Sequence, residues 1–319
     1  MSGKSNAILL VGNGINQAFE DSKDAFIPQK ENWDFKGMSW INIVKQIMLN
    51  CNPDLKYDDV KTLPTTLQIV TASKDDVKKT MKSLSEYMVR DIISEDKAMF
   101  CKQLLTLPVE NILTTNYSYE LEQSVGIPAR KYNYYQCRKD SEKVSKTIHK
   151  LRLYTYSDLP DVKKKVWHIH GDAATPDSMI MGHYYYGKLL REIQLRIKNF
   201  MPFCKGCMNN GVDFESKSWV DLFLTKDVYI VGFGFDFSEM DLWWLAACKK
   251  KEFANTKIHY YAPKGETNTD KRALLDVYSI KIHEEFEVKN KDYISYYEAV
   301  INDIKEKLKK EKEKCKREF

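Results

Sequence analysis

Two histidines stand close together near the middle of the chain, in residues 167–172 (WHIHGD). Alternation along an extended strand predicts that His168 and His170 share one face, with Trp167 and Ile169 on the other. An imidazole with an ordinary pKa of about 6.5 can accept or release a proton near neutral pH. The chain has 6 histidines in all. These two histidines could simply be buried in the hydrophobic core. Their position at a strand end before a glycine favours a functional role at least as strongly as that structural role.

An asparagine follows a second apolar segment, in residues 114–118 (TTNYS). The side chain of Asn116 offers one carbonyl oxygen and two amide protons, which can orient a water molecule or a sugar hydroxyl. Asparagine is also a common helix N-cap, and this alternative stays open from the sequence alone.

Glycine-containing turns follow two further apolar segments. Residues 12–16 (GNGIN) follow the run 7–11, and residues 232–236 (GFGFD) follow the run 228–231. Glycines permit a tight turn and close approach of the backbone to a ligand, and the N-terminus of a following helix can face a phosphate. The first turn lacks the third glycine of the dinucleotide fingerprint, so an ordinary strand-to-helix turn remains an alternative.

Acidic residues follow the second of these turns. Asp236, Glu239 and Asp241 come directly before or within the start of a predicted helix. An acid here could bond a ribose hydroxyl. Ser238 or Asp241 could instead cap the helix.

Strand and helix patterns alternate around these four segments. Continuous apolar runs predict buried strands, and apolar residues spaced by three and four predict helices. Such alternation indicates an α/β fold: a mostly parallel Rossmann-like sheet with helices on both faces, whose ligands bind at the carboxyl ends of the strands. The predicted strands are 7–11, 111–115, 166–170, 228–231 and 257–262. Helices are predicted at 67–70, 75–93, about 186–201 and 294–308, and two more are predicted to begin at about 39 and about 240.

Length and composition set further bounds. With 319 residues, 43% of them hydrophobic, the chain can form one large domain, predicted over 1–285 with a helical insertion at about 37–105. Residues 286–319 are predicted to form a C-terminal helix with a charged tail. Residues 309–318 hold six basic and three acidic side chains, so this tail supplies +3 of the net charge of +5. The rest of the chain is then only +2, which argues against direct nucleic-acid binding.

The chain has no apolar run near 18 residues and no signal-peptide pattern, and its 7 cysteines have irregular spacings. We therefore expect a cytoplasmic protein without membrane spans and without a disulfide framework.

The four segments in this order resemble the sirtuin-like NAD hydrolases of bacterial antiphage defence. The similarity extends over about residues 7–283, and residues 179–185 (MIMGHYY) resemble the Thr-x-x-x-Tyr segment of that family. The resemblance implies an NAD-binding catalytic domain with Asn116 and His170 as its catalytic pair. It also implies an NAD pocket lined by Gly12, Asn13, Gly14, Asn16, Thr115, Asp172, Gly232, Gly234, Phe235 and Asp241.

The sequence also departs from that family. Ser118 stands where an acid usually follows the catalytic asparagine, and the four zinc cysteines of deacetylase sirtuins are reduced to Cys204 and Cys207. One pair cannot complete a tetrahedral zinc site without distant ligands such as His183 or Cys137, so we expect no metal and no peptide deacetylation.

The chemistry expected from the resemblance is cleavage of the nicotinamide–ribose bond of NAD. Nicotinamide leaves as a neutral molecule, so no general acid is needed, unlike ordinary glycoside hydrolysis. We expect His170 to accept a proton, Asn116 to orient the water or the ribose, and backbone amides of residues 12–14 to hold the pyrophosphate. This hypothesis requires the side chains of Asn116 and His170 to converge on one sugar carbon.

Two other interpretations remain open. His168 and His170 could form half of a metal site, completed by Asp172, Asp236 or Asp241, in a metal-dependent hydrolase. The chain could instead be a non-catalytic module that senses NAD or ADP-ribose.

Partners are expected from the resemblance as well. An enzyme that destroys the NAD of its own cell must be restrained, so we expect a homo-oligomer and a separately encoded sensor or ATPase partner. The apolar face of the last helix could serve as a contact, although packing on its own sheet is the more usual role of such a face.

Overall fold

The structure, a computed structural model, describes residues 6–19, 93–128, 134–136, 148–209 and 214–317, together with isolated residues between 44 and 89. Most of the predicted helical insertion, including the helices expected between 39 and 93, lies outside these described residues. The predicted insertion and the domain boundary at 285 therefore stay predictions.

An eight-stranded sheet runs through the centre of the molecule, in the order β3-β4-β5-β2-β1-β6-β7-β8. The strands from β5 to β8 in this order pair in parallel, whereas β3 and β4 form an antiparallel edge. The predicted α/β fold with a mostly parallel sheet is confirmed. The strands are β1 (Ala7–Val11), β2 (Asn111–Thr114), β3 (Tyr134–Gln136), β4 (Thr155–Leu159), β5 (Lys164–His168), β6 (Asp227–Val231), β7 (Ile258–Tyr261) and β8 (Ile280–His283).

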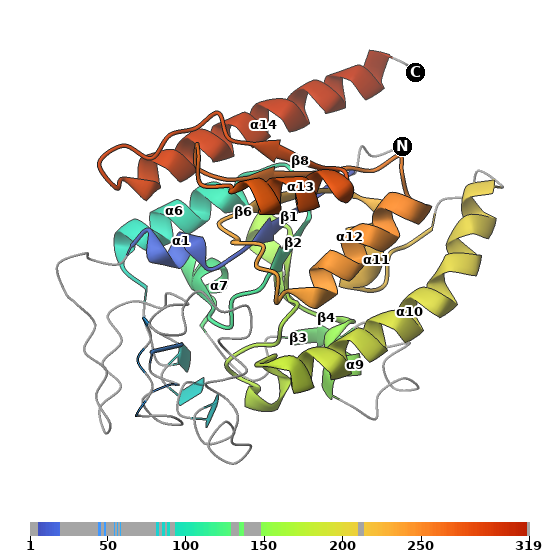
Figure 1. Ribbon diagram of the computed structural model, residues 1–319, viewed down its shortest axis with the longest axis horizontal. Helices are drawn as coiled ribbons and strands as arrows, with labels where there is room; N and C mark the ends of the chain where they lie inside the picture. The colour runs from blue at the N-terminus through green and yellow to red at the C-terminus, as the bar shows by residue number, and fades with distance from the viewer. Residues whose placement is uncertain are drawn as a thin grey trace.

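Helices cover both faces of this sheet, and Figure 1 shows α14 and α10 on different sides of it. The α-helices are α1 (Gly14–Gln17), α6 (Glu95–Leu105), α7 (Glu120–Ser124), α9 (Ile148–Arg152), α10 (His183–Asn209), α11 (Trp219–Thr225), α12 (Met240–Glu252), α13 (Thr269–Val277) and α14 (Tyr293–Arg317). Two short 3-10 helices, η1 (Pro160–Val162) and η2 (Pro176–Ser178), flank β5.

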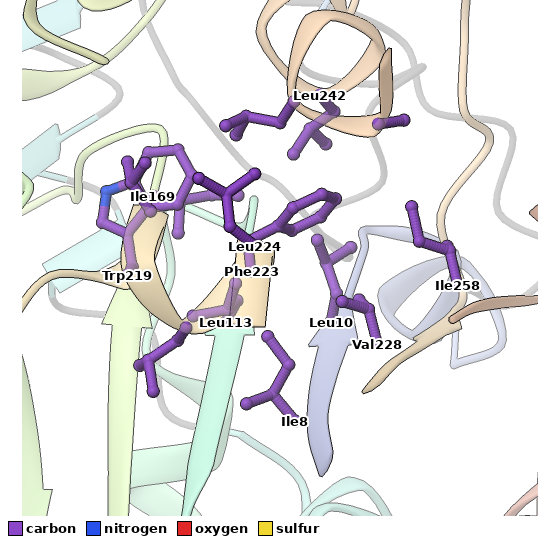
Figure 2. Packing of buried hydrophobic residues seen from close by; sticks show 14 of the residues in the cluster. Ile8, Leu10, Leu113, Ile169, Trp219, Phe223, Leu224, Val228, Leu242 and Ile258 are labelled. Carbon is purple, nitrogen blue, oxygen red and sulfur yellow. The ribbon is translucent and has the colours of Figure 1, made fainter. Parts of the chain in front are cut away.

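The central strand β1 is buried along its whole length, as its continuous apolar sequence predicts. Ile8 and Leu10 face one hydrophobic cluster, to which α10, α11 and α12 contribute. Figure 2 shows Phe223 of α11 and Leu242 of α12 packed over these two side chains. The residues between them point to the opposite cluster, which contains side chains of α6, α7 and α14.

The C-terminal helix packs against its own sheet. Tyr297, Val300, Ile301 and Ile304 of α14 are all buried in the second cluster. The apolar face that could have served as a contact for a partner is therefore used within the chain. The helix also continues through the charged tail as far as Arg317.

The strand that carries the two histidines ends earlier than predicted. β5 finishes at His168, so His170 lies in the turn that follows and not on the strand. Gly171 in this turn has φ +85°, a conformation that residues with a side chain rarely adopt. Because His170 lies in this turn, the direction of its side chain is not fixed by the alternation of side chains along the strand.

No helix among the described residues is long and apolar enough to cross a membrane.

Candidate active site

The four segments singled out in the sequence lie at one edge of the sheet. His168 pairs with Thr114, Thr114 with Val11, and Val11 with Val231, each as the Cα partner in the neighbouring parallel strand. The segments follow β5, β2, β1 and β6, which are adjacent in the sheet. Parallel strands bring their carboxyl ends to the same edge, where ligands of such sheets bind.

Asn116 and His170 occupy equivalent places at this edge. Each lies two residues beyond the paired ends Thr114 and His168, in neighbouring loops. A short bridge connects the two loops: the hydroxyl of Tyr117 donates to the carbonyl of Ile180 at 2.7 Å, and the amide of Ile180 donates to the carbonyl of His170 at 2.9 Å.

His170 forms a buried pair with a carboxylate. Its Nε2 lies 3.0 Å from Oδ2 of Asp241, which belongs to the first turn of α12. The side chain of Asp241 is fully buried and that of His170 is 4% exposed. Burial opposes protonation of His170, but the Asp241 carboxylate outweighs it with help from Glu239, so the pKa of His170 lies above its usual value. Asp241, expected to contact a ribose, therefore holds the imidazole.

A second acid and a phenol complete the surroundings of His170. Oε2 of Glu239 lies 3.8 Å from Nδ1 of His170, beyond hydrogen-bonding distance, and accepts a hydrogen bond of 2.6 Å from the hydroxyl of Tyr186. The ring of Tyr186 also meets the imidazole edge to face, with 5.6 Å between centroids. Burial raises the pKa of Glu239 to about 7, against the opposing effect of His170.

Sequence reasoning missed Glu239 and Tyr186 as site residues. Tyr186 falls at the start of the helix predicted around 186–201, and Glu239 was only one of several acids after the second glycine turn. Their convergence depends on how α10 and α12 pack on the sheet, which no local pattern reports.

The amide of Asn116 is buried and only partly satisfied. Its Nδ2 donates a long hydrogen bond of 3.5 Å to the carbonyl of Gly12, and its Oδ1 has no hydrogen-bond partner among the described residues. The side chain is not used as a helix cap, since α7 begins four residues later at Glu120. A buried carbonyl oxygen without a partner is costly, and a ligand donor would satisfy it.

His168 has different partners from His170. Its Nδ1 lies 2.8 Å from the backbone carbonyl of Asn116, and its Nε2 lies 2.9 Å from Oε1 of Glu122 in α7. Burial opposes protonation, but Glu122 outweighs it and raises the pKa of His168. The two imidazoles bind carboxylates on different helices, so the paired His168/His170 metal ligands of the hydrolase interpretation do not form.

One group of side chains in the described part of the chain could hold a metal ion. His170, Glu239 and Asp241 each place one ligand atom within 4.8 Å of the other two. Asp236, another expected metal candidate, is exposed and accepts hydrogen bonds from the backbone amide and hydroxyl of Ser238. Asp241 bonds His170 through Oδ2 and Glu239 accepts from Tyr186, whereas Oδ1 of Asp241 has no hydrogen-bond partner among the described residues.

The two glycine turns pack against each other. A Cβ on Gly12 would lie 2.5 Å from the carbonyl oxygen of Gly232, so neither turn tolerates a side chain there. The amides of Gly12 and Gly14 donate to the carbonyls of Val231 and Gly232, at 2.9 and 2.6 Å. The expectation that these two amides hold a pyrophosphate is therefore wrong, because the neighbouring turn already uses them.

The remaining pocket candidates near these turns lie at the same edge. Asn13 is the N-cap residue of α1 and makes no side-chain capping bond. Asn16 is 1% exposed and lies near the carboxylate of Glu120, and its side chain has no hydrogen bond of ordinary geometry with the described residues. Thr115 is half-buried and donates its backbone amide to Val11 at 3.2 Å. A Cβ on Gly234 would meet no atom within 4 Å, so the backbone has open space there.

Two expected pocket residues have structural roles instead. The carboxylate of Asp172 is fully buried, forms an ion pair with Arg152 and accepts a hydrogen bond of 2.5 Å from Tyr119. Phe235 is 1% exposed, and its ring packs edge to face on Trp243 at 4.2 Å between centroids. Both side chains were expected at the ligand, and both are committed to the protein interior.

Ser118 stands where the sirtuin-like family usually has an acid, and the structure places an acid, Glu120, beside it. The hydroxyl of Ser118 donates to the carboxylate of Glu120, which is buried 3.5 Å from Nζ of Lys97. Burial raises the pKa of Glu120, but Lys97 and Ser118 outweigh it, so that pKa is lowered and the acid is held ionised. The cysteine pair lies elsewhere: Cys204 is buried and Cys207 is half-buried, both on α10.

A Rossmann-like α/β sheet with an imidazole, a carboxylate and a partly unsatisfied amide at its carboxyl edge is the arrangement of a nucleotide-binding enzyme. Residues 110–283 match the model of the SIR2-like domain family. The match covers more than half of the chain, and this protein belongs to that family. SIR2-like domains bind NAD as a substrate, so the match associates the chain with NAD-dependent activity. Comparison with curated proteins gives no match.

Proposed function

We propose that this protein is an NAD glycohydrolase that cleaves the nicotinamide–ribose bond of NAD and releases nicotinamide and ADP-ribose. The observation that carries the proposal is the His170–Asp241 pair at the carboxyl edge of a SIR2-like sheet, in the loop next to the one that holds Asn116.

The unsatisfied polar atoms at this edge support NAD as the substrate. Oδ1 of Asn116 and Oδ1 of Asp241 are buried without hydrogen-bond partners among the described residues. Both are acceptors, and the hydroxyls of a ribose or a water molecule are donors of the kind they lack. The open backbone at Gly234 adds space on the same side.

The proposed role of His170 follows from its hydrogen bond. If Nε2 carries its proton toward Asp241, Nδ1 keeps a lone pair that can accept a proton from water or from a ribose hydroxyl. The cationic nicotinamide leaves as a neutral group, so the reaction needs a proton acceptor and a positioned nucleophile but no acid. Asn116 would orient that nucleophile through its amide.

The test is release of nicotinamide from NAD by the purified chain, with products separated by chromatography. We expect His170→Ala and Asn116→Ala each to lower turnover by about 10²-fold to 10⁴-fold, the usual loss of a positioned proton acceptor or its equivalent. His183→Ala and Asn255→Ala change the same residue types at exposed positions and serve as matched controls.

Three outcomes would contradict the proposal. Unchanged nicotinamide release by His170→Ala would remove that residue from the mechanism. Nucleotide binding by calorimetry without any product would favour the sensing module instead. Loss of activity on treatment with a strong chelator would favour a metal at His170, Glu239 and Asp241.

We further propose that the hydrolase depletes NAD as an effector of antiphage defence. The support is the order of the four motifs, now placed at one sheet edge, in a chain of the SIR2-like family. Such an enzyme must be inactive until triggered, so control by homo-oligomerisation or by a separately encoded sensor or ATPase partner belongs to this proposal. Measuring mass and NAD turnover with and without a candidate partner tests it, and full activity of the isolated monomer would contradict it.

A further inference from the structure

The buried pair at the centre of the proposed site has one neighbour that reaches solvent. The side chain of Asp241 is fully buried and that of His170 is 4% exposed, whereas that of Glu239 is 19% exposed. A proton accepted by His170 must leave before the next turnover, and Asp241 offers no contact with water. Glu239 is the adjoining carboxylate with such contact.

The carboxylate of Glu239 is also in a position to take up a proton from His170. Glu239 is the N-cap residue of α12, yet its side chain makes no capping hydrogen bond. The carboxylate is instead directed to Nδ1 of His170, 3.8 Å away, and the hydroxyl of Tyr186 fixes it by donating to Oε2 at 2.6 Å. The carboxylate is therefore positioned by groups outside the helix terminus, namely His170 and Tyr186.

The charged and titratable groups around Glu239 have opposing effects on its pKa. His170 lowers its pKa, Asp241 and Asp236 raise it, the Tyr186 hydroxyl lowers it, and burial brings it to about 7. Burial raises the pKa of the Tyr117 phenol, in the loop after β2, and the nearby Glu239 and Asp241 raise it further, so this phenol stays neutral. A carboxyl that changes protonation near neutral pH can both accept a proton and release it to water.

We infer that Glu239 is the residue that carries the proton from Nδ1 of His170 to solvent after each hydrolysis, held in position by Tyr186. This inference rests on the proposed function. In the reaction, water forms a bond to C1′ of the ribose while the C1′–N bond breaks and its electron pair leaves on neutral nicotinamide. One proton of the water is left over. It passes to Nδ1 of His170, then through one bridging water molecule across the 3.8 Å gap to the carboxylate of Glu239, and then to bulk water.

The test compares Glu239→Gln with Glu284→Gln, a matched change at an acid paired with Arg272 and remote from His170 in the chain. We expect Glu239→Gln to bind NAD with unchanged affinity but to lower steady-state turnover by on the order of 10²-fold, because the amide cannot take up the proton. In Glu239→Ala, which leaves space where the carboxylate was, added azide or formate should restore much of the rate, since a small base can replace the missing group. Tyr186→Phe should have a smaller effect in the same direction.

The pH dependence provides a second measurement. His170 and Glu239 titrate as a coupled pair, so the acid limb of turnover belongs to both groups. In the wild type we expect turnover to rise as pH increases through about 7, the value for Glu239. In Glu239→Gln this limb should move, because one member of the pair no longer titrates.

The outcomes separate this inference from the proposed function. A wild-type protein that releases no nicotinamide would contradict the hydrolase and the relay together. A wild type that hydrolyses NAD, with a Glu239→Gln variant that is equally fast or a Glu239→Ala variant that azide does not restore, would contradict the relay alone.

Discussion

Two histidines separated by a single residue form two buried imidazole–carboxylate pairs, and the pairs differ in what they leave available. His168 has a partner at each ring nitrogen, the carbonyl of Asn116 and the carboxylate of Glu122. Among the described residues, His170 has a hydrogen bond at Nε2 only, and its Nδ1 lies 3.8 Å from Oε2 of Glu239.

This difference separates a structural imidazole from a reactive one. Both partners of His168 are acceptors, so the protonated ring, which donates from both nitrogens, satisfies them best. Such a ring ties the loop that carries Asn116 to α7 and has no remaining capacity for substrate. His170 keeps one nitrogen for chemistry. Similar residue type, burial and pKa direction therefore do not imply a similar role.

The largest expected effect is on NAD turnover, which should fall when the carboxylate of Asp241 is replaced but not when that of Glu122 is. Asp241→Asn replaces an acceptor by an amide that can stabilise the wrong tautomer of His170, and we expect NAD turnover to fall on the order of 10²-fold to 10⁴-fold. Glu122→Gln should retain most of the turnover of the folded protein. Product chromatography measures both. An equal loss in the two variants would break the distinction between the pairs.

A stability effect should appear at the other pair. His168→Ala leaves Glu122 as a buried charge without its partner, and we expect the free energy of unfolding to fall by about 3–5 kcal/mol. Urea unfolding followed by circular dichroism measures this. The double variant His168→Ala/Glu122→Ala should lose less than the sum of the single variants, since removing both partners leaves no buried charge. Strictly additive losses would show that the pair does not interact.

The smallest effect is a pH dependence of stability. The pKa of His168 is raised in the folded protein, so its contribution is fully present below the ordinary histidine pKa of about 6.5. It is lost as pH rises through the raised folded pKa, with a limiting slope of about 1.4 kcal/mol per pH unit for one proton. His170 contributes in the same direction. Urea unfolding at several pH values should therefore show a steeper alkaline loss in the wild type than in His168→Ala, and identical slopes would contradict a protonated His168.

Much of the fold follows from local sequence. β1 agrees with its predicted range, and α12, β6 and α14 begin within one residue of the positions predicted from their apolar patterns. β3, an edge strand of three residues, was missed, and so were β4 and β8. Only alternate residues of β4 are buried, and β8 is an edge strand of four residues, so neither has the continuous apolar run that marks a strand buried on both faces.

The site was predictable in part. The sequence indicated which segments meet at the ligand edge, because the ends of parallel strands must lie together. It did not indicate that Gly12 and Gly14 use their amides on the neighbouring turn, or that Phe235 and Asp172 belong to the interior. These outcomes depend on contacts between loops and helices, which have no local signature.

By itself, the sequence determined the alternation of strands and helices and the placing of small and polar residues after the strands, since hydrophobic periodicity and glycine act over a few residues. Only the tertiary structure decided which acid meets which histidine. Glu122 is 46 residues from His168, and Asp241 is 71 residues from His170. The packing of α7 and α12 on the sheet joins each pair, with His168 at the end of β5 and His170 in the turn that follows.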